Sequence, residues 1–349
     1  MKVGLVGFPG AGKTTVFNAL TGLAAETGPG GGRGRSNLGV VKVPDPRVDA
    51  LSTLYQPRKT VHAEVRFSDL PGGAPGGRAL AAEALTAMRD VDALAQVVRG
   101  FGDPATGAPP RPAAERADFE AETILADAEI VERRLARLRK GERGFAGEAE
   151  LLERIGVHLE GGAALRSLAL SAGEWARFTG FAFLSRKPAM AVLNVPEARA
   201  AEPLPSDVAD FCAERGMHAL ALSAPLEAEI AHLPPDERAA FAREMGLDQP
   251  AQDRFIREAY ALLDLVSFFT VGPDEVRAWT IRRGTAAQQA GGRIHSDIER
   301  GFIRAEIVDH AELLRLGSEA KAREAGKLRL EGKEYVVRDG DVAHFRFSV

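Results

Sequence analysis

The stretch GFPGAGKT at residues 7–14 fits the pattern G-x-x-x-x-G-K-[ST]. The apolar run KVGLVG before it predicts a strand, and KTTVFNALTGL after it predicts a helix. A glycine-rich turn in this position directs backbone N–H groups and the positive end of the helix at a phosphate. A chance glycine-rich turn is the alternative, but the flanking strand and helix favour a phosphate-binding loop.

Each residue type in this loop has an expected role. Lys13 can reach the β- and γ-phosphates of a nucleotide and contribute to catalysis, and the Thr14 hydroxyl can ligate Mg²⁺. The loop residues expected to contact the nucleotide are Pro9, Gly10, Ala11, Gly12, Lys13, Thr14 and Thr15.

Composition indicates an ordinary soluble protein of two or three domains. Of 349 residues, 45% are apolar and 27% are charged, and the net charge of −4 gives no general attraction to nucleic acid. Cys212 is the only cysteine, so we expect a reducing, cytoplasmic compartment. The first strand begins almost at residue 2, and no apolar run is long enough to span a membrane, so neither a signal peptide nor a membrane segment is expected. We further expect a monomer that binds no DNA.

Alternation of strands and helices predicts an α/β nucleotide-binding domain in two parts, residues 1–112 and 181–266. Within TVHAEVRF (60–67), every second residue is apolar, which predicts one strand buried on one face. Between the two parts, apolar residues spaced by four and three predict a helical coiled-coil insertion at 113–180 that turns near 141–147. Two surface helices packed on the sheet would give the same pattern. Short β segments then predict a β-rich domain at 267–349, with Asp339-Gly340 as a hairpin signal.

The stretch DLPGGAPGG at residues 69–77 is predicted to be a nucleotide-sensing switch. Asp69 ends a predicted strand and Gly72 follows at the spacing D-x-x-G. In P-loop proteins such an acid holds Mg²⁺ and the glycine N–H meets the γ-phosphate. A plain surface turn is the alternative, and the preceding P-loop favours the switch.

Two later strand ends carry candidate base-contacting residues. NVPE places Asn194, Val195 and Glu197 after one predicted strand, and Ser223 and Ala224 end the next. An asparagine can bridge the phosphate loop and a base, and a helix cap is its alternative role. Glu197 stands where an aspartate would accept the N–H groups of guanine, and Val195 replaces the usual lysine. This pattern weakens the case for GTP.

The chain resembles the YchF subfamily of Obg-like P-loop ATPases over nearly its whole length. The matching stretches are VFNALTG, GVVKVPDPRVDAL, VVRGF, the N-x-x-E tetrad, SAPLEAEIA, EVRAWTI, GRIHSDIERGFIRAE, EAGKLRLEGKEYVVRDGD and FRFSV. The resemblance implies a GTPase-type P-loop domain with a coiled-coil insertion and a C-terminal TGS domain of the ubiquitin-like β-grasp type. It also implies ATP preference and association with ribosomes or RNA.

Two positions depart from that family where hydrolysis is organised. Arg33 stands in the glycine-rich 28–34 region at the position of the switch I threonine, and a guanidinium cannot ligate a metal. Gly73 follows D-x-x-G and has no side chain to position an attacking water. We therefore expect a slow ATPase switch. A non-hydrolysing nucleotide-binding module is the alternative, and a P-loop kinase is disfavoured because the base-reading tetrads fit a GTPase-type domain.

Overall fold

The computed structural model describes residues 1–27, 36–70, 80–103 and 106–348. These residues form two compact units. The first comprises residues 1–40 and 66–255, and the second comprises residues 41–65 and 256–349. No helix among the described residues is both long enough and apolar enough to cross a membrane.

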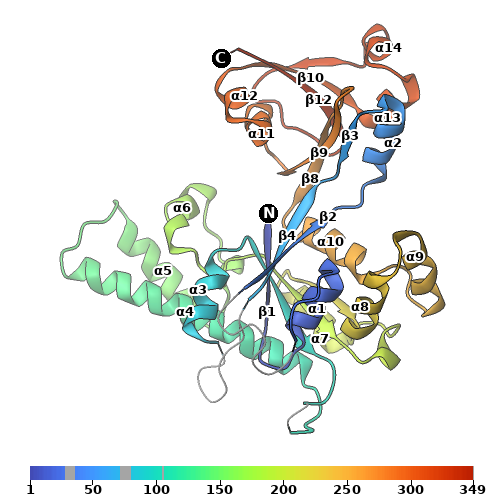
Figure 1. The fold of residues 1–349 in the computed structure, drawn as a ribbon. Coiled ribbons are helices and arrows are strands. Elements are labelled where there is room, and N and C mark those ends of the chain that lie inside the picture. The colour runs from blue at the N-terminus through green and yellow to red at the C-terminus, as the bar shows by residue number, and fades with distance from the viewer. Residues whose placement is uncertain (28–35, 71–79, 104–105, 349) are drawn as a thin grey trace. The chain divides into compact units, whose positions relative to one another are not determined.

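The first unit is built on a six-stranded sheet (Figure 1). Its strands, in the order β2-β4-β1-β5-β6-β7, are β2 (Asn37–Lys42), β4 (Glu64–Asp69), β1 (Lys2–Val6), β5 (Ala93–Arg99), β6 (Ala189–Asn194) and β7 (His218–Leu222). The pairs β1–β4, β1–β5, β5–β6 and β6–β7 are parallel. Since the strands are parallel, the loops that follow β1, β4, β6 and β7 gather at one edge of the sheet, and the candidate site residues lie there.

Helices of several lengths connect and cover these strands. They are α1 (Lys13–Thr21), α3 (Ala82–Arg89), α4 (Pro112–Arg139), α5 (Glu148–Glu160), α6 (Ala172–Ala176), α7 (Ser206–Glu214), α8 (Ala224–His232), α9 (Pro235–Glu244) and α10 (Ala251–Leu262), with short 3₁₀ helices η1 (Leu165–Ser167), η2 (Thr179–Phe181) and η3 (Glu197–Arg199). Helix α1 packs against α8, and α4 contacts both β5 and α7. The P-loop domain predicted from the sequence is confirmed.

The predicted helical insertion is the pair α4–α5, whose helices lie side by side (Figure 1). Ile124 and Val131 of α4 share one buried cluster with Leu152, Ile155 and Leu159 of α5, as the spacing of apolar residues predicts. The first half of α4 packs instead on the sheet, where its apolar residues join a cluster with residues of β1 and β5. Coiled-coil pairing and packing on the sheet, posed as alternatives by the sequence, therefore occupy successive parts of one helix.

The second unit contains the C-terminal β-grasp domain. Its sheet has the order β11-β10-β12-β8-β9-β3, with β3 (Lys59–Val61), β8 (Leu265–Thr270), β9 (Glu275–Arg282), β10 (Phe302–Asp309), β11 (Arg329–Glu331) and β12 (Asp341–Phe347). The accompanying helices are α2 (Pro46–Tyr55), α11 (Ala287–Ile294), α12 (Ser296–Arg300), α13 (His310–Leu316) and α14 (Glu319–Glu324). Ala287 and Ala290 of α11 pack on the sheet beside Phe268 and Ile307.

The segment TVHAEVRF does not form the single strand that its alternation predicts. Residues 59–61 form β3, which pairs with β9, whereas residues 64–69 form β4, which pairs with β1. The alternation of apolar residues correctly marks which side chains are buried, but it does not specify the sheet that buries them. Strand β2 also gave no signal in the sequence reading, and it lies at the edge of the first sheet.

Asp339-Gly340 forms a turn that leads into β12, and the hairpin predicted there is wrong. The antiparallel partner of β12 is β10, not the segment just before the turn. The Asp339 carboxylate accepts from the Ser267 backbone N–H at 2.9 Å and pairs with Arg47 at 2.8 Å. Gly340 has φ +90°, and a Cβ there would lie 2.6 Å from Nδ1 of His310. These contacts fix the turn without any strand pairing across it.

Candidate nucleotide-binding site

The predicted phosphate-binding loop lies between β1 and α1, and its backbone has a positive φ at three glycines, of which Gly7 has φ +138°. Gly10 and Gly12 have φ of +79° and +85°, and Gly12 is the N-cap of α1. A Cβ on Gly12 would lie 2.3 Å from Nδ2 of Asn194, whereas a Cβ on Gly10 would meet nothing within 4 Å. A Cβ on Gly7 would lie 2.4 Å from the Val97 carbonyl oxygen, so the loop is crowded at Gly7 and again at Gly12, immediately before Lys13. Pro9 and Gly10 are exposed.

Lys13 folds back over this loop. Its Nζ donates to the backbone carbonyls of Gly7 at 3.0 Å and Phe8 at 3.1 Å. Burial lowers the pKa of Lys13, and the carboxylates of Asp69 and Glu115 oppose that shift. The ammonium thus lies inside the loop, where a phosphate could replace two neutral carbonyl acceptors.

Thr14 and Asp69 meet beside the loop, as the sequence predicts. The Thr14 hydroxyl donates to Oδ2 of Asp69 at 2.8 Å, and Asn37 Nδ2 donates to the same oxygen at 3.2 Å. A hydroxyl and a carboxylate oxygen side by side are the hard oxygen donors that Mg²⁺ prefers, so this pair fits the ion. Asn37 was not predicted, because its place beside Asp69 comes from β2, which the sequence reading did not identify.

Asn194 connects the phosphate loop to the loop after β7. Its Nδ2 donates to the Ala11 carbonyl at 3.1 Å, and its Oδ1 accepts from the Ala224 backbone N–H at 3.1 Å. Asn194 is buried. The sequence predicted that this amide bridges the phosphate loop and a base, whereas its two hydrogen bonds here join two loops of the protein. The Ala224 N–H, expected to face a base, donates to Asn194.

The other predicted base-contacting residues lie in different surroundings. Val195 packs in a core cluster with Leu193 and Val208. Ser223 is buried and its hydroxyl has no hydrogen-bond partner among the described residues. Glu197 is exposed at the first position of η3. Gly72, Gly73 and Arg33, together with the 28–34 loop, lie outside the described residues.

Glu115 is a site residue that sequence reasoning missed. It lies on α4, is buried, and accepts from Arg99 through both the backbone N–H at 3.4 Å and Nε at 3.3 Å. Burial raises the pKa of Glu115, and Arg99 and Lys13 oppose that rise. Because α4 is distant from the phosphate loop in sequence, no local motif marks this contact.

Known proteins match the chain over its whole length. A family profile described as "50S ribosome-binding GTPase" matches residues 2–132, and the YchF-GTPase C-terminal profile, described as "Protein of unknown function (DUF933)", matches residues 265–348. "Ribosome-binding ATPase YchF" from Bacillus subtilis (strain 168) is 38% identical over 371 residues, covering 100% of each chain. The chain belongs to the YchF family.

Other members agree with this assignment. The YchF protein from Escherichia coli O157:H7, also named a ribosome-binding ATPase, is 39% identical over 361 residues, covering 100% of this chain and 99% of its own. The solved structure of the Schizosaccharomyces pombe YchF GTPase superposes with a TM-score of 0.86 at 30% identity, covering 99% of this chain and 97% of that one. The resemblance to YchF inferred from the sequence motifs is confirmed.

Proposed function

We propose that this chain is a nucleotide-dependent switch that binds ATP with Mg²⁺, hydrolyses it slowly to ADP and phosphate, and acts with the ribosome. The observation that carries the proposal is the phosphate loop itself, with Lys13 inside it and the Thr14–Asp69 pair at its side. The names of the two bacterial relatives supply the ribosome and the ATPase activity. Ribosome binding in turn supports work in the cytoplasm.

In this proposal the loop amides and Lys13 hold the phosphates, and Thr14 and Asp69 hold Mg²⁺. The ion would supply positive charge to the β- and γ-phosphates. Lys13 exchanges its bonds to two backbone carbonyls for bonds to phosphate oxygens, which are stronger acceptors because they are charged. Asn194 keeps the loop and the start of α8 in register through its two hydrogen bonds.

Preference for ATP over GTP rests on Glu197 and Val195. The buried Val195 side chain places no ammonium over the base, and Glu197 replaces the aspartate that accepts guanine N–H groups. Competition between ATP and GTP for the same chain tests this preference. A tenfold preference for GTP would overturn it.

Slow hydrolysis rests on the sequence departures at Gly73 and Arg33. With no side chain at Gly73 to position water, the proposal assigns catalysis to phosphate positioning by Lys13 and the Gly72 N–H. The alternative is a module that binds nucleotide without cutting it. We also propose that the insertion at 113–180 and the domain at 267–349 are the parts that transmit nucleotide state to the partner.

Calorimetric titration with Mg-ATP, followed by a single-turnover assay with and without ribosomes, tests these statements. We expect micromolar binding that Lys13→Ala abolishes, and product formation above the level of that variant. If the wild type binds no nucleotide in this titration, the proposal is wrong. Binding without product, with or without ribosomes, would select the non-hydrolysing alternative.

A further inference from the structure

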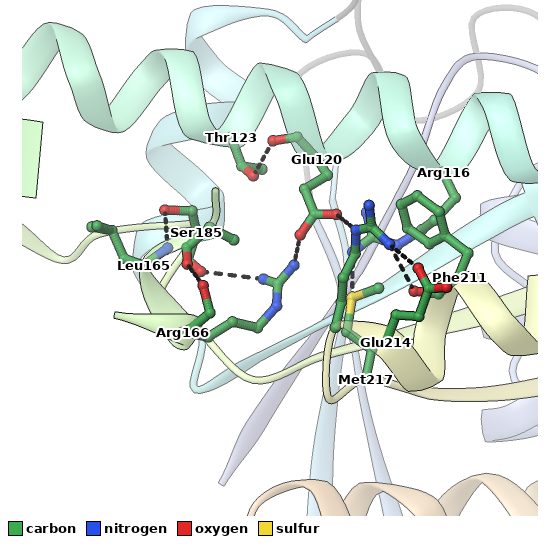
Figure 2. Close-up of polar contacts among 12 residues, drawn as sticks. Arg116, Glu120, Thr123, Leu165, Arg166, Ser185, Phe211, Glu214 and Met217 are labelled. Atoms are coloured by element: carbon green, nitrogen blue, oxygen red, sulfur yellow. Dashed lines mark hydrogen bonds and ion pairs between the residues drawn. The ribbon is translucent and has the colours of Figure 1, made fainter. Parts of the chain in front are cut away.

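A second concentration of positive charge lies further along α4. Arg166 on η1 and Arg215 just after α7 pair with one buried carboxylate, that of Glu120, and Arg116 on α4 lies close enough to both arginines to affect their charges. Figure 2 shows Arg116 and Glu120 descending from the same helix and Arg166 reaching Glu120 from another segment. We call these four residues the arginine pocket. None of them belongs to the nucleotide site described above.

Arg116 is a buried cation that lacks a carboxylate partner among the described residues. Arg116 is only 3% exposed to solvent. No acceptor in the described chain lies within hydrogen-bonding distance of its Nε or Nη1, and its Nη2 contacts the Met217 sulfur at 2.7 Å. The rings of Phe119 and Phe211 flank the guanidinium, each centroid 5.9 Å away. Aromatic faces and a thioether offset only part of the lost hydration of a guanidinium.

The other two arginines, Arg166 and Arg215, share a single buried carboxylate, that of Glu120. One of its oxygens is bound by Nη2 of Arg166 and the other lies 3.4 Å from Nε of Arg215. Arg166 Nε has no acceptor among the described residues. Glu214 contacts Arg215 at 3.2 Å, but its side chain is 72% exposed, so solvent screens this charge. Three arginines therefore stand against two carboxylates, one buried and one exposed, which leaves a formal local charge of +1.

The energetic consequence is visible in the pKa values of the arginines. Burial lowers the pKa of Arg116 to about 10 and that of Arg166 to about 9. The positive charges of Arg116 and Arg215 lower the pKa of Arg166 further. Both groups still carry their protons at neutral pH. The pocket thus keeps like charges together in a partly buried place, which is unfavourable unless an anion joins them.

The space for an anion is present. A pocket of about 310 Å³ is lined by two carboxylates, Glu120 and Glu214, by Arg166, Ser167 and Arg215, and by the small residues at 162–164. Two hydrogen bonds hold Arg166 at the wall of this pocket, because its backbone N–H and its Nη1 both donate to the Ser185 carbonyl at 3.2 Å. Arg215 is 41% exposed at the mouth. Such a volume lies at the small end of ligand sites.

We propose that the arginine pocket binds a small anion of the phosphate monoester class. Planar guanidinium groups match phosphate oxygens in pairs, and a monoester carries close to two negative charges at neutral pH. A monoester is therefore attracted more strongly to the guanidinium groups than a carboxylate or an RNA phosphodiester, each of which carries one negative charge. The ligand oxygens bind Arg166 and Arg215 directly, and Arg116 contributes its field from behind them.

Calorimetry on the full-length Lys13→Ala variant tests the proposal, because that background weakens phosphate binding at the nucleotide loop. The probes are inorganic phosphate, glycerol 3-phosphate, acetate and a short single-stranded RNA. We expect the two phosphate compounds to bind with a Kd of about 1 mM or tighter and acetate to bind at least about tenfold more weakly. RNA binding tighter than that of both phosphate compounds would overturn the proposal in favour of an RNA contact.

Substitutions test whether each residue of the pocket strengthens or weakens phosphate binding. Arg166→Gln and Arg215→Gln are expected to weaken phosphate binding at least about tenfold, since each removes charged donors. Glu120→Gln is expected to tighten it, because the competing carboxylate is gone, and phosphate should restore the thermal stability that this variant loses. Arg243→Gln, an exposed arginine on α9 that bonds within its own helix, serves as the control and should change nothing.

The Arg215→Gln variant is expected to fold normally because the Arg215 side chain is 41% exposed, so its phosphate affinity can be measured. Failure of the wild-type pocket to bind either phosphate compound would overturn the proposal. So would phosphate binding that is unchanged in Arg215→Gln, or a Glu120→Gln variant with weaker phosphate binding. None of these results depends on ATP binding, so they are separable from a failure of the proposed function.

Discussion

Two positive centres lie beside the first half of α4, and the protein treats their charges differently. Lys13 bonds to two backbone carbonyls and has the carboxylates of Asp69 and Glu115 nearby. Arg116 has none of these among the described residues, and its neighbours Arg166 and Arg215 share a single carboxylate. In the nucleotide loop, the protein itself supplies the hydrogen-bond acceptors and the negative charges that surround the Lys13 ammonium. The arginine pocket leaves its charge for a ligand to satisfy.

The largest expected effect breaks the nucleotide loop. Gly12→Ala places a Cβ 2.3 Å from Asn194 at a φ of +85°, so the loop must shift. We expect ATP affinity to fall about 100-fold, equivalent to about 3 kcal/mol. Gly10→Ala is the matched control, with a similar φ but open space around the new methyl group, and should lose far less. Equal losses in the two variants, measured by calorimetry, would mean that the contact with Asn194 is irrelevant.

The next largest expected effect is on the stability of the arginine pocket. Arg116→Met removes an uncompensated buried cation and keeps a side chain of similar length. In phosphate-free buffer we expect the free energy of unfolding to rise by about 2 kcal/mol, because such replacements of buried charge are often stabilising. Denaturant titration measures this change.

The same titration repeated with phosphate completes that test. Phosphate should stabilise the wild type and have little effect on Arg116→Met, so the advantage of the variant shrinks. A variant that is less stable than the wild type in both buffers would show that the chain already compensates Arg116.

Asn194→Ala should have an intermediate effect. It removes two hydrogen bonds and leaves the Ala11 carbonyl and the Ala224 N–H buried without partners. We expect a loss of about 1.5 kcal/mol in the free energy of unfolding, together with weaker ATP binding. Asn18→Ala is the control, because Asn18 makes an equivalent two-bond bridge to Ala25 away from the phosphate loop. It should lower stability and spare ATP affinity.

The smallest effect concerns a charge pair that is fully matched. Arg134 on α4 donates to Glu148 on α5 at 2.5 and 3.0 Å, and these hydrogen bonds lower the pKa of Glu148. The stability that this carboxylate contributes is present above its unfolded pKa and is lost as the pH falls through its lower native pKa. Glu148→Gln should therefore lower the melting temperature at neutral pH, by an amount that vanishes in acid.

The window for that loss begins near the ordinary glutamate pKa of about 4.3 and extends below it. Thermal melts between neutral pH and pH 3 check it. Glu150→Gln, an exposed glutamate on the same helix, is the control and should follow the wild type at every pH. A Glu148→Gln deficit that persists unchanged in acid would contradict the assignment of the stabilisation to the charged pair.

Much of the nucleotide site was predictable because its residues act through local sequence. The loop 7–14 needs glycine where φ is positive, and the lysine and threonine follow at fixed spacing because they start the next helix. Asp69 and Asn194 were found for a related reason, since each ends a strand of a parallel sheet and such ends meet at one edge. Glu115 and Asn37 were not predicted, because their contacts join segments that no local pattern connects.

The sequence by itself determined the phosphate loop, the seam of the helical pair and the family of the chain. These depend on residue type and spacing, which survive without knowledge of the fold. Only the tertiary structure decided that one alternating segment divides between two sheets, and that two arginines distant in sequence, Arg166 and Arg215, share one carboxylate. Burial and charge balance depend on which segments pack together, and spacing along the chain carries no information about distant partners.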